Sequence, residues 1–278
     1  MGIFDFLSKA LGPKTDIPLV PKMPDPVQTV ARPVKTLFPA RPANALGARA
    51  FLSELGSVDP TVRDAKIRDQ IISGNAPSWM KPVSLTIQQG AHTLIVQVLP
   101  DYLCFGSDTD FLTYNVNHTN LQAICERFSC VMPTRSMVNQ YYKQAVTRLT
   151  PQPQGAPYDS TMSNTDRMVR FNSTIEVAKH NAGHSNGYLI AGHKKDVVMS
   201  AQAIAHPGME SIYGWHQPSG VPIQPLSYAH ERGYSDYSHG GRLTLRRVNL
   251  NGVDMDISTV LSDPASCGLL SDEGPLHI

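Results

Sequence analysis

Hydrophobic and polar positions follow two different spacings along the chain, and the spacing changes after about residue 183. The earlier segments repeat apolar residues every three or four positions, which is typical of amphipathic helices. These predicted helices are 57–75, 117–130, 133–146 and 163–183. The later segments are short and rich in β-branched and aromatic residues, which favours strands. These predicted strands are 187–191, 196–199, 211–216, 242–249 and 253–257.

One strand-like region comes early. Residues 82–106 alternate with a period of two on both sides of Gln89-Gly90, which predicts a hairpin that a strand at 102–105 extends. An Asn251-Gly252 pair predicts a tight turn between the last two strands. Helices followed by strands indicate an α+β domain. We expect the helices of its first half to pack on a mostly antiparallel sheet formed largely by its C-terminal half.

The N-terminal residues have a different character. Residues 1–12 place apolar side chains at helical spacing and predict an amphipathic anchor helix. Residues 13–45 hold eight prolines and predict an extended tether. A single globular domain is expected over 46–278. An anchor followed by a tether suits attachment to a membrane surface or to a partner protein of a larger assembly, such as a virion; packing of the helix on its own domain is the alternative.

Composition narrows the location and the partners. With 41% hydrophobic residues, 17% charged residues and a net charge of +1, the chain lacks the basic surplus of a nucleic-acid-binding protein. We expect synthesis in the cytoplasm, because neither a signal peptide nor a transmembrane segment is recognisable. The four cysteines form no C-x-x-C pair and are expected to be free thiols.

Histidine is the strongest compositional signal. Seven of the ten histidines fall between positions 180 and 239. Three of them, His180, His206 and His230, are expected to be isolated loop residues. Three others, His193, His216 and His239, each stand within two residues of a glycine or proline at a predicted junction of strand and turn. Because adjacent strands align such junctions at one edge of a sheet, we expect these three to share a site within 180–242.

The residue types around these histidines suggest a metal-activated water. A catalytic zinc takes three protein ligands and keeps one position for water. The predicted ligands are His193, Asp196, His216 and His239, with Asp236 as an alternative carboxylate. Lys194 or Lys195 would stabilise an oxyanion. Tyr237, two residues before His239, completes the predicted site.

A thiol offers a second chemistry. Cys130 precedes the helix predicted to begin near Thr134, and a helix N-terminus lowers the pKa of a nearby thiol. One of the histidines would then act as its base, as in Cys–His hydrolases. The alternative is that Cys130 is a small buried apolar residue.

Several segments between residues 74 and 275 resemble a set of uncharacterised bacterial and phage proteins. They read DYLCFGSDTDF, CVMPTRSMVNQ, AGHKKDVV, IYGWHQPSG, PIQPL, DYSHGGRL and LLSDEGP. The resemblance implies that the histidine segments belong to one domain. The order His193, Asp196, Trp215-His216 is also similar to that of D-alanyl-D-alanine-type metallopeptidases of bacterial cell walls, although only 19 residues separate Asp196 from Trp215.

Three functions follow as hypotheses. The first is a hydrolase of amide or peptide bonds, with peptidoglycan as its substrate. The second is a structural or adaptor protein of a virion or another large assembly, which the anchor and the tether favour. The third, phosphate or nucleic-acid chemistry, depends on basic residues in turns, namely Lys194, Lys195, Arg242, Arg246 and Arg247; such residues are usually solvated, which argues against it.

Overall fold

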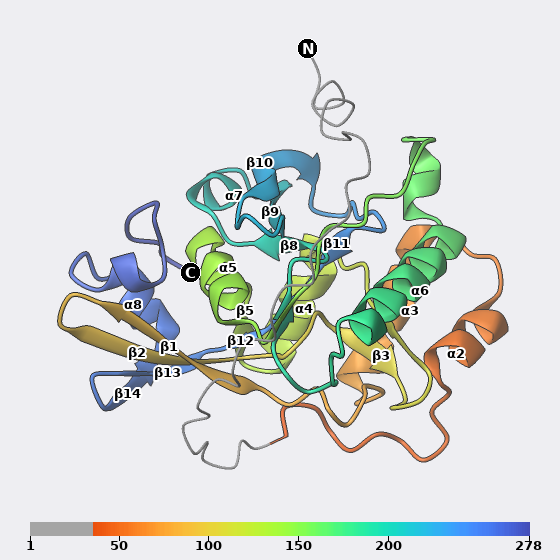
Figure 1. The fold of residues 1–278 in the computed structure, drawn as a ribbon, viewed down its shortest axis with the longest axis horizontal. Coiled ribbons are helices and arrows are strands. Elements are labelled where there is room, and N and C mark those ends of the chain that lie inside the picture. Colours follow the sequence, from red (N-terminus) through yellow and green to blue (C-terminus); the bar gives the residue numbers. More distant parts are fainter. Residues whose placement is uncertain (1–35) are drawn as a thin grey trace.

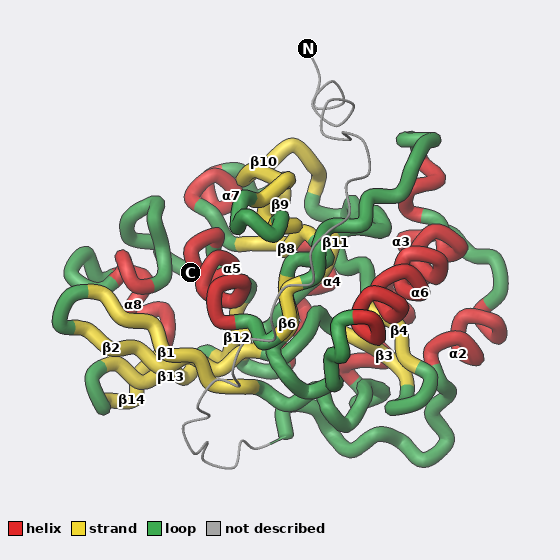
Figure 2. The backbone as a smooth tube through the Cα atoms, in the orientation of Figure 1, coloured by secondary structure: helices red, strands yellow, loops and turns green. Residues whose placement is uncertain are grey.

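Helices occupy mainly the first half of the domain and strands mainly the second, as the sequence predicted (Figures 1 and 2). The computed structural model describes residues 36–278. The predicted anchor helix and tether residues 13–35 lie outside the described residues. Within the part that the structure describes, no helix is both long enough and apolar enough to cross a membrane.

The helices begin where the sequence places capping residues. α3 follows Asp59 and α5 follows Thr134, and each capping side chain accepts a hydrogen bond from a backbone N–H of the first turn. The α-helices are α2 (Ala48–Leu55), α3 (Pro60–Ile72), α4 (His118–Arg127), α5 (Arg135–Gln144), α6 (Thr165–Asn181), α7 (Ala201–Ala205) and α8 (Ile257–Ser262). Two short 3-10 helices are η1 (Ser160–Ser163) and η2 (Cys267–Leu269).

The main sheet is antiparallel and combines early and late strands in the order β14-β13-β2-β12-β5, with β1 also paired to β2. Its strands are β1 (Val83–Gln89), β2 (His92–Val98), β5 (Cys130–Val131), β12 (Thr244–Leu245), β13 (Arg247–Leu250) and β14 (Val253–Asp256). The predicted hairpins at Gln89-Gly90 and Asn251-Gly252 both form. The single strand predicted over 242–249 is instead two strands, because β12 pairs with β2 and β5 whereas β13 pairs with β2 and β14.

A second sheet, which we call the histidine sheet, has the order β10-β9-β8-β11. Its strands are β8 (Lys195–Val198), β9 (Met209–His216), β10 (Pro222–Glu231) and β11 (His239–Gly240). β8 pairs antiparallel with β9 and parallel with β11. Helix α5 lies between the two sheets and contacts both β9 and β1 (Figure 1). One face of α5 therefore covers the histidine sheet.

The remaining strands form two small ladders. β3 (Cys104–Gly106) pairs antiparallel with β4 (Phe111–Thr113), and β6 (Thr147–Arg148) pairs parallel with β7 (Ile190–Ala191). The segment 187–200 was expected to be strand, turn and strand. Its two strands do form, but β7 joins β6 while β8 joins β9 and β11, so the intervening turn is not the tip of a hairpin.

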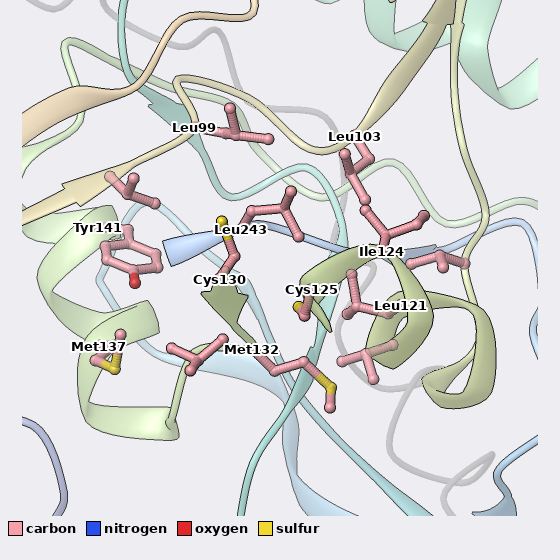
Figure 3. Packing of buried hydrophobic residues seen from close by; sticks show 14 of the residues in the cluster. Leu99, Leu103, Leu121, Ile124, Cys125, Cys130, Met132, Met137, Tyr141 and Leu243 are labelled. Carbon is pink, nitrogen blue, oxygen red and sulfur yellow. The ribbon is translucent and has the colours of Figure 1, made fainter. Parts of the chain in front are cut away.

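The largest hydrophobic cluster joins the helices to the main sheet, and Figure 3 shows its centre around Cys130. The cluster reaches back beyond residue 46, because Leu37 and Phe38 pack against it and the Phe38 ring meets Phe128 edge-on at 5.0 Å. The packed domain thus includes residues from the end of the predicted tether.

Candidate functional site

The histidine sheet carries the three histidines that the sequence singled out. His216 ends β9, His239 begins β11, and His193 lies two residues before β8. Lys195 of β8 is paired with His239 on one side and with Gly214 on the other. The three predicted junctions therefore belong to neighbouring strands, although their side chains contact different partners.

His193 belongs to a buried ion network. Its Nε2 lies 3.1 Å from Oδ1 of Asp101, and Oδ2 of the same carboxylate lies 2.8 Å from Nζ of Lys179. Burial lowers the pKa of His193 although Asp101 opposes the shift, so the ring is neutral at pH 7. Asp101 is ionised, because the charge of Lys179 and the hydrogen bond with His193 outweigh its burial and hold its pKa well below the usual range. The neutral ring of His193 therefore holds the Asp101 carboxylate in place through its Nε2 atom.

Lys194 is fully committed to acceptors of its own chain. Its Nζ donates to Oδ1 of Asn115 at 2.8 Å and to the carbonyl oxygens of Tyr237 and His239 at 2.9 and 3.0 Å. Burial lowers the pKa of Lys194 to about 7. The predicted role of Lys194 in steadying an oxyanion is not supported, because its three donor positions already have acceptors. The hydroxyl of Tyr237 is likewise engaged, 2.9 Å from the backbone nitrogen of Gln154.

His239 lies between two carboxylates. Its Nδ1 is 3.0 Å from Oδ1 of Asp236, and its Nε2 is 3.2 Å from Oε1 of Glu210. Burial alone would lower the pKa of His239, but the two acidic partners outweigh it and raise the pKa to about 9. Lys195 adds a second cation, with Nζ 3.6 Å from Oδ2 of Asp236 and above the Trp215 ring. The raised pKa favours the imidazolium form of His239 at pH 7, between the carboxyl groups of Asp236 and Glu210, and the backbone N–H of Asp236 also donates to Nδ1.

Asp196 sits on β8 in a buried environment of mixed polarity. The hydroxyl of Tyr102 donates to its Oδ2 at 2.8 Å, whereas within residues 36–278 its Oδ1 has no hydrogen-bond partner. Burial raises the pKa of Asp196 to about 7, and the charge of Arg242 opposes this rise. At neutral pH a large fraction of Asp196 is therefore a neutral carboxylic acid that can give up a proton.

His216 is held between helix α5 and the end of β9. Its Nε2 lies 3.0 Å from Oδ1 of Asn139, and its ring stacks on Tyr142 with the centroids 4.6 Å apart. Because Oδ1 is an acceptor, Nε2 carries the proton and Nδ1 keeps the lone pair. Burial lowers the pKa of His216 to about 4, so the ring is neutral at pH 7. Asn139 itself is exposed, so this end of the site reaches the surface.

Gly214 brings Asp196 and His216 to one place. A methyl group added to Gly214 would lie 3.4 Å from Oδ2 of Asp196 and 3.7 Å from Cε1 of His216. Its φ of +115° is one that side chains rarely adopt, and the next residue, Trp215, also has a positive φ of 58°. This distortion turns the end of β9 and directs His216 toward α5. Asp196 and His216 thus border a common space about the size of a methyl group, which Val138 also borders through its Cγ1 atom.

The glycines beside the histidines serve the packing of the protein itself. A Cβ on Gly240 would lie 2.6 Å from Cδ1 of Tyr102, and one on Gly192 would lie 2.4 Å from the carbonyl oxygen of Leu149. Both glycines are therefore needed for close contacts within the protein itself.

The four predicted zinc ligands do not fit a single ion. Among the described residues, no group of three or more His, Cys, Asp or Glu side chains is arranged to hold a metal ion. His193 and His239 direct ring nitrogens at Asp101, Asp236 and Glu210, and each contact belongs to a separate ion network. Zinc stays a prediction without support from this geometry.

Cys130 is a core residue and not an activated thiol. It is 3% exposed, and its Sγ donates to the carbonyl oxygen of Phe128. Figure 3 shows it among apolar side chains, including Leu243 and Met132. Burial raises the pKa of Cys130 to about 12, so the expected lowering by the following helix is wrong. The thiol is in β5, five residues before α5 begins, and apolar burial dominates there.

A surface hollow of about 450 Å³ lies elsewhere, between residues 154–157 and the start of α6. It contains Arg167 and Arg170 but none of the predicted site residues. The guanidinium of Arg167 already donates to the carbonyl oxygens of Gly155 and Pro157. The candidate site on the histidine sheet and this surface hollow are therefore separate parts of the molecule.

The sequence did not indicate which residues orient the side chains of the predicted site. Asn139 and Tyr142 lie three apart on a predicted helix, but only the packing of α5 on the histidine sheet shows that they meet His216. Asp101 and Tyr102 stand in the quoted segment DYLCFG, and no local pattern connects them with residues about 90 positions later. Comparison of the chain with protein family models, with curated proteins and with solved structures gave no match.

Proposed function

We propose that this protein is a hydrolase of amide or peptide bonds in which His216 is the general base and Asp196 the general acid. Its proposed substrate is the peptide of peptidoglycan. The observation that carries the proposal is the position of both side chains around one space at Gly214, within 4 Å of the same point. A proton acceptor and a proton donor that face one reacting group are what amide hydrolysis requires.

His216 suits the role of base. Its Nε2–H is donated to Asn139, which fixes the ring and leaves Nδ1 to accept a proton from water. Stacking on Tyr142 restricts rotation of the ring. Asn139 and Tyr142 are therefore positioning residues, because they contact the base and not the substrate.

Asp196 suits the role of acid. In the proposed step, the oxygen of a water molecule bonds to the amide carbon and its proton passes to Nδ1 of His216. The carbon–nitrogen bond then breaks, and the leaving nitrogen takes the proton of Asp196. Transfer of a proton from His216 to Asp196 through water restores both groups. Opposite pKa shifts support this assignment, because they leave the base unprotonated and about half of the acid protonated near pH 7.

The test is release of fragments from purified peptidoglycan, followed by mass spectrometry. Wild-type protein is compared with His216→Ala, Asp196→Asn and a control, His206→Ala, which changes an exposed histidine that stacks on Tyr228. Release by the wild type and the control, but not by the two site variants, is expected. A chelator arm tests the zinc prediction, since loss of release on chelation would restore a metal mechanism. Equal release by all variants would contradict the proposal.

A structural or adaptor role is the second candidate, and one observation favours it. Lys194, His193 and His239 all contact polar or charged groups of their own chain, as in a scaffold that uses buried ions to specify its fold. That role would use residues 1–45 for attachment to a larger assembly. It predicts that His216→Ala leaves assembly unchanged and that no bond of peptidoglycan is cleaved.

A further inference from the structure

One face of helix α5 continues the candidate site beyond His216. Arg135, Asn139 and Tyr142 occupy positions i, i+4 and i+7 of this helix, so they share one face. Asn139 and Tyr142 contact His216 directly. Arg135 is one turn further along, at the N-terminal end of α5, and its side chain is 31% exposed. The face thus presents a cation next to the residues that hold the base.

Tyr213 connects this cation to the base. Its hydroxyl donates to Oδ1 of Asn139 at 2.9 Å, the same oxygen that meets His216. Burial raises the pKa of Tyr213, while the charge of Arg135 opposes the shift and that of Asp272 adds to it. Both charges therefore act on the hydroxyl that adjoins the site.

Arg135 has a partner that a ligand can replace. Its Nη2 lies 2.8 Å from Oδ2 of Asp272, whose side chain is 46% exposed. Exposed ion pairs of this kind contribute little to stability, because both groups are well solvated when apart. The Nε of Arg135 is buried and lacks a hydrogen-bond partner among residues 36–278, so the exposed terminal nitrogens of the guanidinium are the ones that a ligand can reach. A planar guanidinium is suited to binding a carboxylate through two parallel hydrogen bonds.

We propose that Arg135 binds a carboxylate of the substrate in exchange for Asp272, and so selects peptides with a free carboxylate close to the scissile amide. This inference rests on the proposed function. One helical turn separates Arg135 from Asn139, which is about 6 Å along the helix axis. An extended peptide advances roughly 3.4 Å per residue. The carboxylate is therefore expected within about two residues of the cleaved bond, as at the C-terminus of a short peptide.

The experiment uses one acetylated tripeptide with a free C-terminal carboxylate and its C-terminal amide. Cleavage of both by the full chain is measured as kcat/KM. Binding of both is measured in parallel by NMR titration, which does not require turnover. The variants are Arg135→Gln, Asp272→Asn and a matched control, Arg68→Gln. Arg68 forms an exposed ion pair of the same 2.8 Å length with Asp69 on α3.

We expect the wild type to prefer the acid over the amide by at least about tenfold, as for a bidentate charged hydrogen bond. Arg135→Gln should abolish this preference, because kcat/KM for the acid falls by at least about tenfold relative to that for the amide. Asp272→Asn should strengthen binding of the acid, because the competing carboxylate is gone, and Arg68→Gln should change nothing. A merely structural role of Arg135 predicts equal losses for the acid and the amide.

The two proposals fail in different ways. Cleavage of both peptides at equal rates by the wild type would overturn carboxylate selection and leave the hydrolase intact. Binding of the acid that depends on Arg135, without cleavage, would overturn the hydrolase and leave carboxylate recognition standing. If neither peptide binds nor is cleaved, both proposals are overturned.

Discussion

Tyr102 donates a hydrogen bond of 2.8 Å to Oδ2 of Asp196, although the two residues are 94 positions apart in sequence. Oδ2 is also the oxygen of Asp196 that lies beside the space at Gly214, whereas Oδ1 is unpaired within the described chain. Tyr102 therefore fixes the orientation of the carboxyl group at that space. Proton transfer at this site depends on the ionisation of Asp196 and of His216.

The rate of hydrolysis should have a bell-shaped dependence on pH. Activity requires unprotonated His216, whose pKa is about 4, and protonated Asp196, whose pKa is about 7. The rate is then expected to rise as pH increases through about 4 and to fall as it increases through about 7. Measurement of kcat/KM between pH 3 and 9 checks this. A rate that still increases above pH 8 would show that Asp196 does not act as the acid.

Asp196→Asn should stabilise the protein at alkaline pH. The folded-state pKa of Asp196 is raised to about 7 from 3.8, so its contribution to stability is full below pH 3.8 and is lost as pH rises through 7. The amide cannot ionise and avoids this loss. We expect the variant to be more stable than the wild type at pH 8 by about 1–4 kcal/mol, and nearly equal at pH 4. Urea unfolding at both pH values measures the difference, and a variant less stable at pH 8 would contradict it.

Local patterns were enough to predict the longer helices and several strands, but not strand β10 and not how the strands pair. The caps at Asp59 and Thr134 and the turn at Asn251-Gly252 are encoded by neighbouring residues, so these elements were predictable. The partners of β7 and β8 were not, because β7 joins β6 from more than 40 residues earlier. A two-residue strand offers no pattern that could identify its partner.

The candidate site shows the same limit. Histidine clustering led to the histidine sheet, yet the direction of each ring depends on distant acidic or amide groups. The pKa of His239 is raised chiefly by Asp236, three residues earlier, and further by Glu210, which lies 29 residues earlier on another strand. Cys130 is inert because apolar side chains surround it, and proximity to a helix in the sequence did not reveal that. Residue types in the sequence indicated which segments carry ionisable side chains. Tertiary packing determines the partners and the protonation of each of them.

His239→Gln should destabilise the fold strongly at neutral pH. The imidazolium compensates two buried carboxylates, Asp236 and Glu210, and removing one member of a buried ion group typically costs about 3–5 kcal/mol. Because the pKa of His239 is raised to about 9, its contribution is full below pH 6.5 and is lost as pH rises through 9. The difference from the wild type should therefore shrink above pH 9. Thermal unfolding from pH 6 to 10 tests this, with His206→Gln as an exposed control.

Cys130→Ala should retain full hydrolytic activity. The thiol is buried in the main cluster and its pKa is about 12, so almost no thiolate is present at pH 7. Loss of the sulfur from a packed core should cost about 1 kcal/mol of stability, measured by urea unfolding. Release of peptidoglycan fragments by the variant is compared with release by Cys267→Ala, another buried cysteine. A selective loss of activity in Cys130→Ala would revive the thiol mechanism.

Asn139→Ala should lower kcat without unfolding the protein. Asn139 is exposed and its Oδ1 orients His216, so its removal frees the ring while little buried surface is lost. Misplacement of a catalytic group by about 1 Å can reduce the rate by roughly 100-fold, whereas KM should change little because Asn139 is not expected to contact the substrate. Gln140→Ala is the control, since this neighbour on α5 bonds Gln144 instead. If the two variants have equal kcat, the ring of His216 does not depend on Asn139, and the assignment of Asn139 as a positioning residue fails.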